Sequence, residues 1–396
     1  MEFSQYHVDT LMEITSRPDL VFVRGEGSWL EDNNGKRYLD FIQGWAVNCL
    51  GHCAPEMIAA LDKQARTLLN PSPAFYNEPM LQLAQRLTTA SVFDSVFFAN
   101  SGAEANEGAI KLARKWGRVH RNGAYKIITM DHGFHGRTLA TMSASGKPGW
   151  DTMFAPQVEG FPKANLNDLE SVRALIDAQT VAIMLEPVQG EGGVIPATSE
   201  FMQGLRKLAN EHGLLLIVDE VQTGMGRTGT LFAYQQMDIT PDIMTLGKGI
   251  GGGVPLAALL ARKEVSVFAH GEQGGTYNGN PLMTAVGVAV FDALTAPGFL
   301  DTVQARGRQL SEGLLALSAK WGMQGERGAG LLRALLMDRS DGPAIVEAAR
   351  ELAPQGLLLN APRANVLRFM PALNVSEQDT DYMLKTLDGI ITTIRR

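Results

Sequence analysis

The 396-residue sequence contains little cysteine and no long apolar run. Its two cysteines, Cys49 and Cys53, have neither a second pair nor a following histidine cluster, so neither a disulfide framework nor a metal site is expected. Apolar runs such as Leu214 to Val218 are far shorter than the roughly 20 residues needed to cross a bilayer. The N-terminus lacks the basic start and apolar run of a secretion signal. We therefore expect a cytoplasmic protein with reduced thiols.

An excess of positive charge is also missing. The 35 basic and 42 acidic residues give a formal net charge of −7, which argues against a general nucleic-acid or anionic-membrane surface but leaves small anionic ligands open. With 45% hydrophobic and 19% charged residues, the composition is that of an ordinary folded protein. The length predicts two or three domains.

The middle of the chain has the pattern of an α/β protein. Short apolar runs alternate with segments of helical period, which predicts a mostly parallel sheet with flanking helices. Ligands collect beyond the carboxyl ends of such strands. The predicted strands are Ser95 to Ala99, Lys126 to Met130, Val181 to Leu185, Leu214 to Val218, Ile243 to Leu246 and Leu256 to Ala261.

The two ends of the chain predict a smaller α+β domain. Residues 21–40 are interpreted as a hairpin, because Asp32-Asn33-Asn34-Gly35 is strong turn chemistry, and this hairpin is expected to pair with the C-terminal part. After Pro281 a long helical stretch precedes the runs Leu331 to Met337 and Val366 to Met370. We predict an N-terminal segment 1–55 that joins the small domain, a large domain 56–290 and a C-terminal small domain 291–396.

The first strand exit predicts a helix start. Ser101 and Glu104 have capping-box spacing, and Gly102 would let an anion approach the free N–H groups of the helix. A capped structural helix explains the same residues. The next exit, Asp131 to Thr138, holds Phe134, which could cover an aromatic ring, and Arg137, which could bind a carboxylate. His132 and His135 are interpreted as ordinary loop hydrogen-bonding groups.

Two further exits hold acids and a lysine. Asp219 and Glu220 end an apolar run, where one carboxylate should face the site and could hold a protonated ring nitrogen, although capping of the loop is an alternative. Lys248 lies among glycines from Gly247 to Gly253, a setting suited to Schiff-base chemistry or to a plain turn. Residues 224–229 spell G-x-G-x-x-G, but they do not directly join a strand to a helix, so we interpret them as a structural turn.

Six motifs in order resemble the class III, ornithine-aminotransferase-like aminotransferases of pyridoxal 5′-phosphate (PLP) fold type I. They are SGAEAN, FHGRT, LEPVQGEGG, VDEVQTGMGRTG, TLGKGIGGGVP and GGTYNGNP, and they span most of the chain. The resemblance implies PLP as cofactor and Lys248 as the Schiff-base lysine and proton shuttle, with Asp219 on the pyridine nitrogen. It also implies a homodimer with shared active sites, because Thr276 would reach the neighbouring subunit's cofactor. The other implied cofactor residues are Ser101, Gly102, Ala103, Phe134, Val221 and Gln222.

The same resemblance implies how substrates are held. Arg368 resembles the clamp for the α-carboxylate of glutamate, Arg137 the clamp for the donor carboxylate, and Glu191 the gate that pairs with Arg368 while the donor is bound. The run Gly44 to His52 is closest to acetylornithine aminotransferases, although Trp45 and Ala54 depart from their pattern. Trp45 is thus a candidate pocket wall or a packing residue.

The expected reaction moves the terminal amine of N-acetylornithine to 2-oxoglutarate by a ping-pong mechanism, giving an aldehyde and glutamate. Ornithine, succinylornithine and 4-aminobutyrate remain alternative donors. An NAD-dependent oxidoreductase and a PLP-binding regulator without turnover are the alternatives outside this class.

Overall fold

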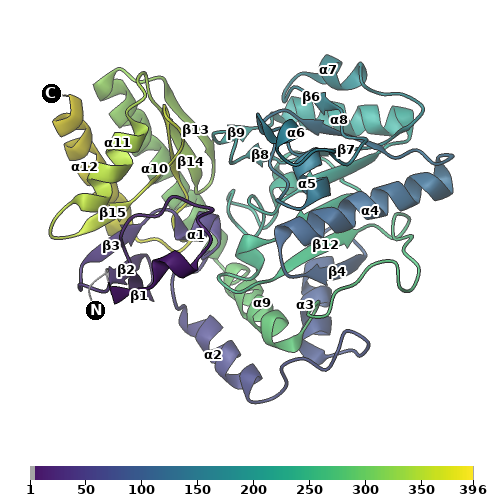
Figure 1. Ribbon diagram of the computed structural model, residues 1–396, viewed down its shortest axis with the longest axis horizontal. Helices are drawn as coiled ribbons and strands as arrows, with labels where there is room; N and C mark the ends of the chain where they lie inside the picture. The colour runs from purple at the N-terminus through teal and green to yellow at the C-terminus, as the bar shows by residue number, and fades with distance from the viewer. Residues whose placement is uncertain (1–4, 396) are drawn as a thin grey trace.

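Seven strands form the central sheet of the larger lobe in the computed structural model, which describes residues 5–395 (Figure 1). All six predicted strands are present and the predicted α/β fold class is confirmed. Only β12 runs against its neighbours, so the other strands end at one edge of the sheet. In spatial order the strands are β4 (Ser95–Ala99), β12 (Ala257–Ala261), β11 (Ile243–Leu246), β10 (Leu215–Asp219), β7 (Thr180–Leu185), β5 (Lys126–Met130) and β6 (Lys163–Ala164).

Helices cover both faces of this sheet, which explains why its strands are continuously apolar. On β10, Leu215 and Ile217 pack in a cluster with α4, whereas Leu216 and Val218 pack in a cluster with α8. Alternate side chains of one strand therefore serve two cores. The helices of this lobe are α2 (Pro55–Ala65), α3 (Glu78–Thr89), α4 (Gly102–His120), α5 (Leu139–Ala144), α6 (Trp150–Met153), α7 (Leu169–Arg173), α8 (Ser199–His212) and α9 (Pro281–Leu294).

The smaller lobe combines the two ends of the chain (Figure 1). One of its sheets has the order β1 (Phe22–Glu26), β2 (Trp29–Asp32), β3 (Arg37–Asp40) and β15 (Gly356–Leu358). The other is antiparallel, with the order β13 (Gly325–Ala329), β14 (Leu332–Leu336), β17 (Val366–Phe369) and β16 (Asn360–Arg363). Its helices are α10 (Phe299–Trp321), α11 (Gly342–Glu351) and α12 (Glu377–Arg395).

The N-terminal strands are tied to the C-terminal part of the chain. β3 pairs in parallel with β15, and Trp29 Nε1 donates to Asp379 Oδ1 at 3.2 Å. The segment predicted as one hairpin has three strands, because Gly27, at φ 55°, makes an additional turn before β2. The predicted turn at Asp32 joins β2 to β3, and its carboxylate accepts from Asn34 N and Lys36 N. The predicted domain limits at 55 and 290 stay predictions.

The glycine segment 224–229 is hydrogen-bonded to the smaller lobe. It forms turns and is followed by the short 3₁₀ helix η3 (Ala233–Gln236), which lacks the strand-to-helix context of a dinucleotide site. Arg227 is buried and donates to the carbonyl oxygens of Leu331, at 3.0 Å, and Pro371, at 2.6 Å. Burial lowers the pKa of Arg227 to about 10. The segment is therefore structural, as predicted.

Further features of residues 5–395 concern membrane-spanning helices, metal ligands and cysteines. No single helix in this range has the length and apolarity to cross a membrane; α9 and α10 together meet that test by length and composition, but with a 72° bend between them. No group of His, Cys, Asp and Glu in the described residues could hold a metal ion. Both cysteines are free, Cys49 buried and Cys53 exposed.

Candidate active site

A cavity of about 280 Å³ lies where the strands of the large sheet end. Since β4, β5, β7, β10 and β11 end at the same edge, their following loops converge there. We call it the central cavity. Most of the predicted site residues line it, namely Gly102, Ala103, Phe134, Arg137, Glu191, Asp219, Val221, Gln222 and Lys248.

The N-terminus of α4 forms one end of the central cavity. The Ser101 Oγ accepts from Glu104 N at 3.2 Å and the Glu104 carboxylate accepts from Ser101 N at 2.9 Å, so the predicted capping box is present. The first-turn N–H groups of Gly102 and Ala103 have no partner within the helix. A Cβ on Gly102 would lie 2.7 Å from Val221 Cγ1, so only glycine fits here. Ser101 itself serves as the cap and lies outside the cavity lining.

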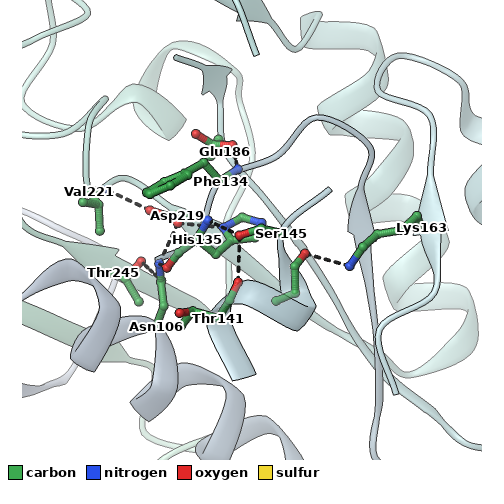
Figure 2. Close-up of polar contacts among 11 residues, drawn as sticks. Asn106, Phe134, His135, Thr141, Ser145, Lys163, Glu186, Asp219, Val221 and Thr245 are labelled. Atoms are coloured by element: carbon green, nitrogen blue, oxygen red, sulfur yellow. Dashed lines mark hydrogen bonds and ion pairs between the residues drawn. The ribbon is translucent and has the colours of Figure 1, made fainter. Parts of the chain in front are cut away.

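Asp219, at the end of β10, is held by three donors (Figure 2). Asn106 Nδ2 lies 2.7 Å and His135 Nδ1 2.8 Å from Asp219 Oδ2, and Val221 N lies 3.0 Å from Oδ1. Thr245 Oγ1 donates to Asn106 Oδ1 at 2.7 Å and so orients that amide. The buried carboxylate is thereby fixed and aimed at the cavity.

The neighbouring acid, Glu220, points away from the central cavity. Its carboxyl accepts from Ala233 N at 2.6 Å and from Tyr234 N at 2.8 Å. Burial raises its pKa to about 7, although these backbone N–H groups oppose the shift. Of the two adjacent acids, Glu220 is the one that caps a loop, and Asp219 is the one that faces the site.

Lys248 begins the 3₁₀ helix η4 (Lys248–Ile250), separated from the end of β11 by one residue. Its backbone φ is +46°, a left-handed conformation that a residue with a Cβ rarely adopts. Burial lowers the pKa of the Lys248 amine; Glu191 opposes this shift and Arg368 adds to it. A lowered pKa increases the fraction of neutral amine, which is the nucleophilic form.

Arg368 is buried between three groups. Its Nη1 donates to Glu191 Oε1 at 2.7 Å, its Nε donates to Asn360 Oδ1 at 2.9 Å, and its guanidinium lies 5.5 Å from the ring centre of Trp45. The Arg368 side chain is 1% exposed and that of Glu191 36%. The structure thus brings the predicted clamp and gate together, with Trp45 over the clamp.

An unusual backbone turn presents Trp45. All four residues of α1 (Gln43–Ala46) have positive φ, from 49° to 67°, so the segment is a left-handed turn. Each such residue other than glycine costs roughly 1–2 kcal/mol. Asp40 Oδ1 accepts from Ile42 N and Gln43 N and holds the start of the turn. Trp45 is 49% exposed, so it is not a core packing residue.

Arg137, the predicted donor clamp, lines the central cavity without an ion pair to any residue in the range 5–395. Its guanidinium lies 5.9 Å from the ring centre of the buried Trp150, whose ring is also 5.7 Å from that of Phe134. Sequence reasoning missed Trp150, because nothing in its surroundings marks it as part of the FHGRT motif.

Thr276 does not line the cavity of its own chain. It is exposed in the loop before α9, where its carbonyl oxygen accepts from Asn70 Nδ2 at 3.4 Å. Its predicted contact with a neighbouring subunit's cofactor stays a prediction.

The residues of the central cavity fit PLP. The free N–H groups of α4 suit a phosphate, Asp219 suits a protonated ring nitrogen, and Phe134 and Val221 line the cavity as apolar covers. Gln222 Nε2 is a buried donor without a partner in the described chain, as expected for a group that meets an oxygen of the ligand. Lys248 supplies the amine.

The sheet topology and this set of residues define a PLP-dependent aminotransferase of fold type I. Residues 13–391 match the family model described as aminotransferase class-III, and the chain belongs to this family. Members of the family depend on PLP.

Three relatives illustrate the similarity. The chain is 80% identical over 396 residues, all of both chains, to acetylornithine aminotransferase 2 of Bordetella pertussis. It superposes with a TM-score of 0.83 and 37% identity on N-acetylornithine aminotransferase from Stenotrophomonas maltophilia, covering 96% of this chain and 97% of that one. It also superposes on ornithine aminotransferase from Toxoplasma gondii with a TM-score of 0.92 and 31% identity, covering 98% of this chain and 94% of that one.

Glu186 is a cavity residue that sequence reasoning did not single out. It is buried, and its Oε2 accepts from Phe134 N at 2.9 Å (Figure 2). Burial raises its pKa well above the ordinary value, and the nearby Asp219 adds to the shift. The folded protein therefore favours the protonated form of this carboxyl more than the unfolded chain does.

Glu186→Gln is expected to remove part of the pH dependence of stability. A raised pKa in the folded state stabilises the protein at low pH and this contribution is lost as pH rises, at about 1.4 kcal/mol of unfolding free energy per pH unit between the unfolded and folded pKa. Glutamine keeps the shape but does not titrate, so its curve should be flatter over that range. Urea unfolding of both holoenzymes from pH ~5 upward measures this, and parallel curves would contradict a raised pKa of Glu186.

Proposed function

We propose that this chain transfers the terminal amino group of N-acetylornithine to 2-oxoglutarate, producing an aldehyde and glutamate. The observation that carries the proposal is the arrangement of two arginines around Glu191. Arg137 lines the central cavity with Glu191 and has no ion-pair partner within residues 5–395, while Arg368 is paired with Glu191 at 2.7 Å. The site at Arg137 is thus open to a carboxylate, whereas the site at Arg368 is available only when Glu191 moves away. The names of the Bordetella and Stenotrophomonas relatives support the choice of donor.

Each side chain has a defined task in this proposal. When bound, PLP supplies an electron-withdrawing ring and a carbon that carries the amino group between substrates. Lys248 Nζ takes the proton from the carbon next to the donor's terminal amine and returns it during transfer. Asp219 keeps the ring nitrogen protonated, and Arg137 binds the carboxylate of the donor.

The switched arginine explains how one cavity serves two substrates. While N-acetylornithine is bound, Glu191 neutralises Arg368, so no second carboxylate is needed. 2-Oxoglutarate carries two carboxylates, and its second one takes the place of Glu191 on Arg368. Trp45, over the guanidinium, adds a cation–π contact that keeps this arginine in place.

A panel of donors tests the proposal. Purified holoenzyme with 2-oxoglutarate should use N-acetylornithine with the highest kcat/KM, ahead of succinylornithine, ornithine and 4-aminobutyrate. The initial-velocity lines should be parallel, as in a two-step transfer. Intersecting lines would contradict the ping-pong order, and a preference for free ornithine would contradict the acylated donor.

The homodimer is part of the proposal. The loop before α3 and the loop holding Thr276 are joined by Asn77 Nδ2, which donates to Gly279 O at 2.9 Å. They expose large apolar side chains, namely Leu69, Phe75, Tyr76 and Tyr277. Such a patch is typical of a protein interface. Sedimentation equilibrium should give twice the chain mass, whereas a monomer at micromolar concentration would contradict shared sites. The cytoplasmic location stays a prediction.

A further inference from the structure

Glu191 lies between two cavities. It lines the central cavity with Lys248, and it also lines a second cavity of about 280 Å³. Three basic side chains, His132, Lys147 and Arg363, line this second cavity and are exposed, so it opens to solvent. We call it the basic pocket. Of the acids within residues 5–395, Glu191 alone lines it.

Of the ion pair between Arg368 and Glu191, only the acid is free to move. Arg368 is 1% exposed and is held additionally by Asn360 and Trp45. Glu191 is 36% exposed, and Arg368 is its one side-chain partner in the described part of the chain. Glycines precede and follow Glu191 in the chain. A substrate carboxylate that takes the place of Glu191 on Arg368 Nη1 therefore moves the acid rather than the arginine.

A displaced carboxylate needs new partners, because an uncompensated charge in a partly buried place is costly. Lys147 and Arg363 have no carboxylate partner within residues 5–395; Lys147 Nζ lies over the Trp150 ring at 5.2 Å. Burial raises the pKa of Glu191, but Arg368, Lys248 and Lys147 together lower it below its ordinary value. Lys147 thus lines the same pocket as Glu191, and its charge contributes to the lowered pKa of this acid.

We infer that Lys147 and Arg363 form the second resting place of the Glu191 carboxylate, occupied while a dicarboxylate such as 2-oxoglutarate or glutamate is bound to Arg368. The inference rests on the proposed function. Lys147 and Arg363 are positioning residues, because they act on the substrate through Glu191. They stabilise Glu191 after it has left Arg368. In the donor half-reaction Glu191 stays paired with Arg368.

The double variant Lys147→Met/Arg363→Met tests this inference on the holoenzyme. The two half-reactions are followed separately by the absorbance of the cofactor after rapid mixing. The apparent KM for 2-oxoglutarate should rise roughly 3- to 10-fold, as expected for the loss of two exposed charge pairs. The apparent KM for N-acetylornithine should move much less. Lys207→Met/Arg173→Met, two exposed cations on α8 and α7, matches the change in net charge and should show neither effect.

The same double change in a Glu191→Gln background separates the gate from direct substrate binding. If the two cations act through Glu191, they have no charge to receive in that background, and the further rise in KM should vanish. An undiminished rise would mean that the cations bind the substrate themselves and would overturn the inference. An equal rise for both substrates would also overturn it.

The wild-type enzyme distinguishes failure of the inference from failure of the proposed function. If wild type does not use 2-oxoglutarate, the proposed acceptor is wrong and the inference falls with it. If wild type uses 2-oxoglutarate and the double variant equals wild type in both half-reactions, only the inference is wrong. Calorimetric titration with glutarate, which binds without reacting, should show the same weakening as the KM for 2-oxoglutarate.

Discussion

Lys248→Ala is expected to abolish amino-group transfer, with a loss of at least about 10⁴-fold in turnover, the upper range for a positioned proton-transfer group. Among residues 5–395, Lys248 is the one lysine that lines the central cavity, and burial already favours its neutral form. No other lysine amine in the described part of the chain lines this cavity to bind the cofactor or to move the proton at the donor carbon. Single-turnover measurement with N-acetylornithine gives the rate. Borohydride reduction followed by peptide mass spectrometry gives the attachment site.

A second partly buried lysine provides the control. Lys163, on β6 and labelled in Figure 2, donates to Thr129 Oγ1 and to the carbonyl oxygens of Ser143 and Ala144. Burial lowers its pKa to about 8. It resembles Lys248 in burial but does not line the cavity. Lys163→Met should lower stability and still give cofactor attached at Lys248. Turnover by Lys248→Ala close to that of wild type would contradict the role of Lys248 as the lysine that binds the cofactor and moves the proton.

Asp219→Asn is expected to reduce turnover about 10²- to 10³-fold, the range for removing one preorganised electrostatic group from an active site. The substitution keeps the size of the side chain but removes the negative charge that favours a protonated ring nitrogen. Asp219 Oδ2 now accepts from Asn106 Nδ2 at 2.7 Å and from His135 Nδ1 at 2.8 Å. An amide nitrogen at that position would be a donor facing two donors. PLP binding should weaken as well, which equilibrium dialysis measures independently of turnover.

Glu220 is a matched control for Asp219. It is the next residue and equally buried, but its carboxyl accepts from Ala233 N and Tyr234 N on the far side of the loop. Glu220→Gln should change the unfolding free energy and leave PLP affinity unchanged. If both variants lost PLP equally, the effect would be one of loop stability rather than of charge at the cofactor.

The sequence predicted the sheet and most of the central cavity for a physical reason. Strands covered on both faces are continuously apolar, as in β10, and polar residues follow where such strands end. Since parallel strands end at one edge, Gly102, Phe134, Asp219 and Lys248 were expected to meet, and they do. These are properties of short segments, which the sequence displays directly.

Other parts of the site depend on contacts between distant segments. The hydrogen bond of His135 to Asp219 joins residues 84 positions apart, and the sequence alone gave no reason to pair them. Four residues of positive φ in α1 contradict local preference, because Trp45 and Ala46 favour right-handed backbone. Asp40 accepts hydrogen bonds at the start of that turn, and Arg368 contacts the ring of Trp45 within it. Because these contacts come from outside the turn, its own residues did not predict it.

The division of the small lobe between the two chain ends has a consequence for synthesis on the ribosome. Trp29 and its partner Asp379 are 350 residues apart, so at ~5–20 residues per second the N-terminal strands wait roughly 20–70 s for their partners. During this time the large lobe can fold, while Leu39 and Phe41, fully buried in the finished protein, lack β15. Leu39 and Phe41 therefore stay without the strand that pairs with β3 until β15 has been synthesised.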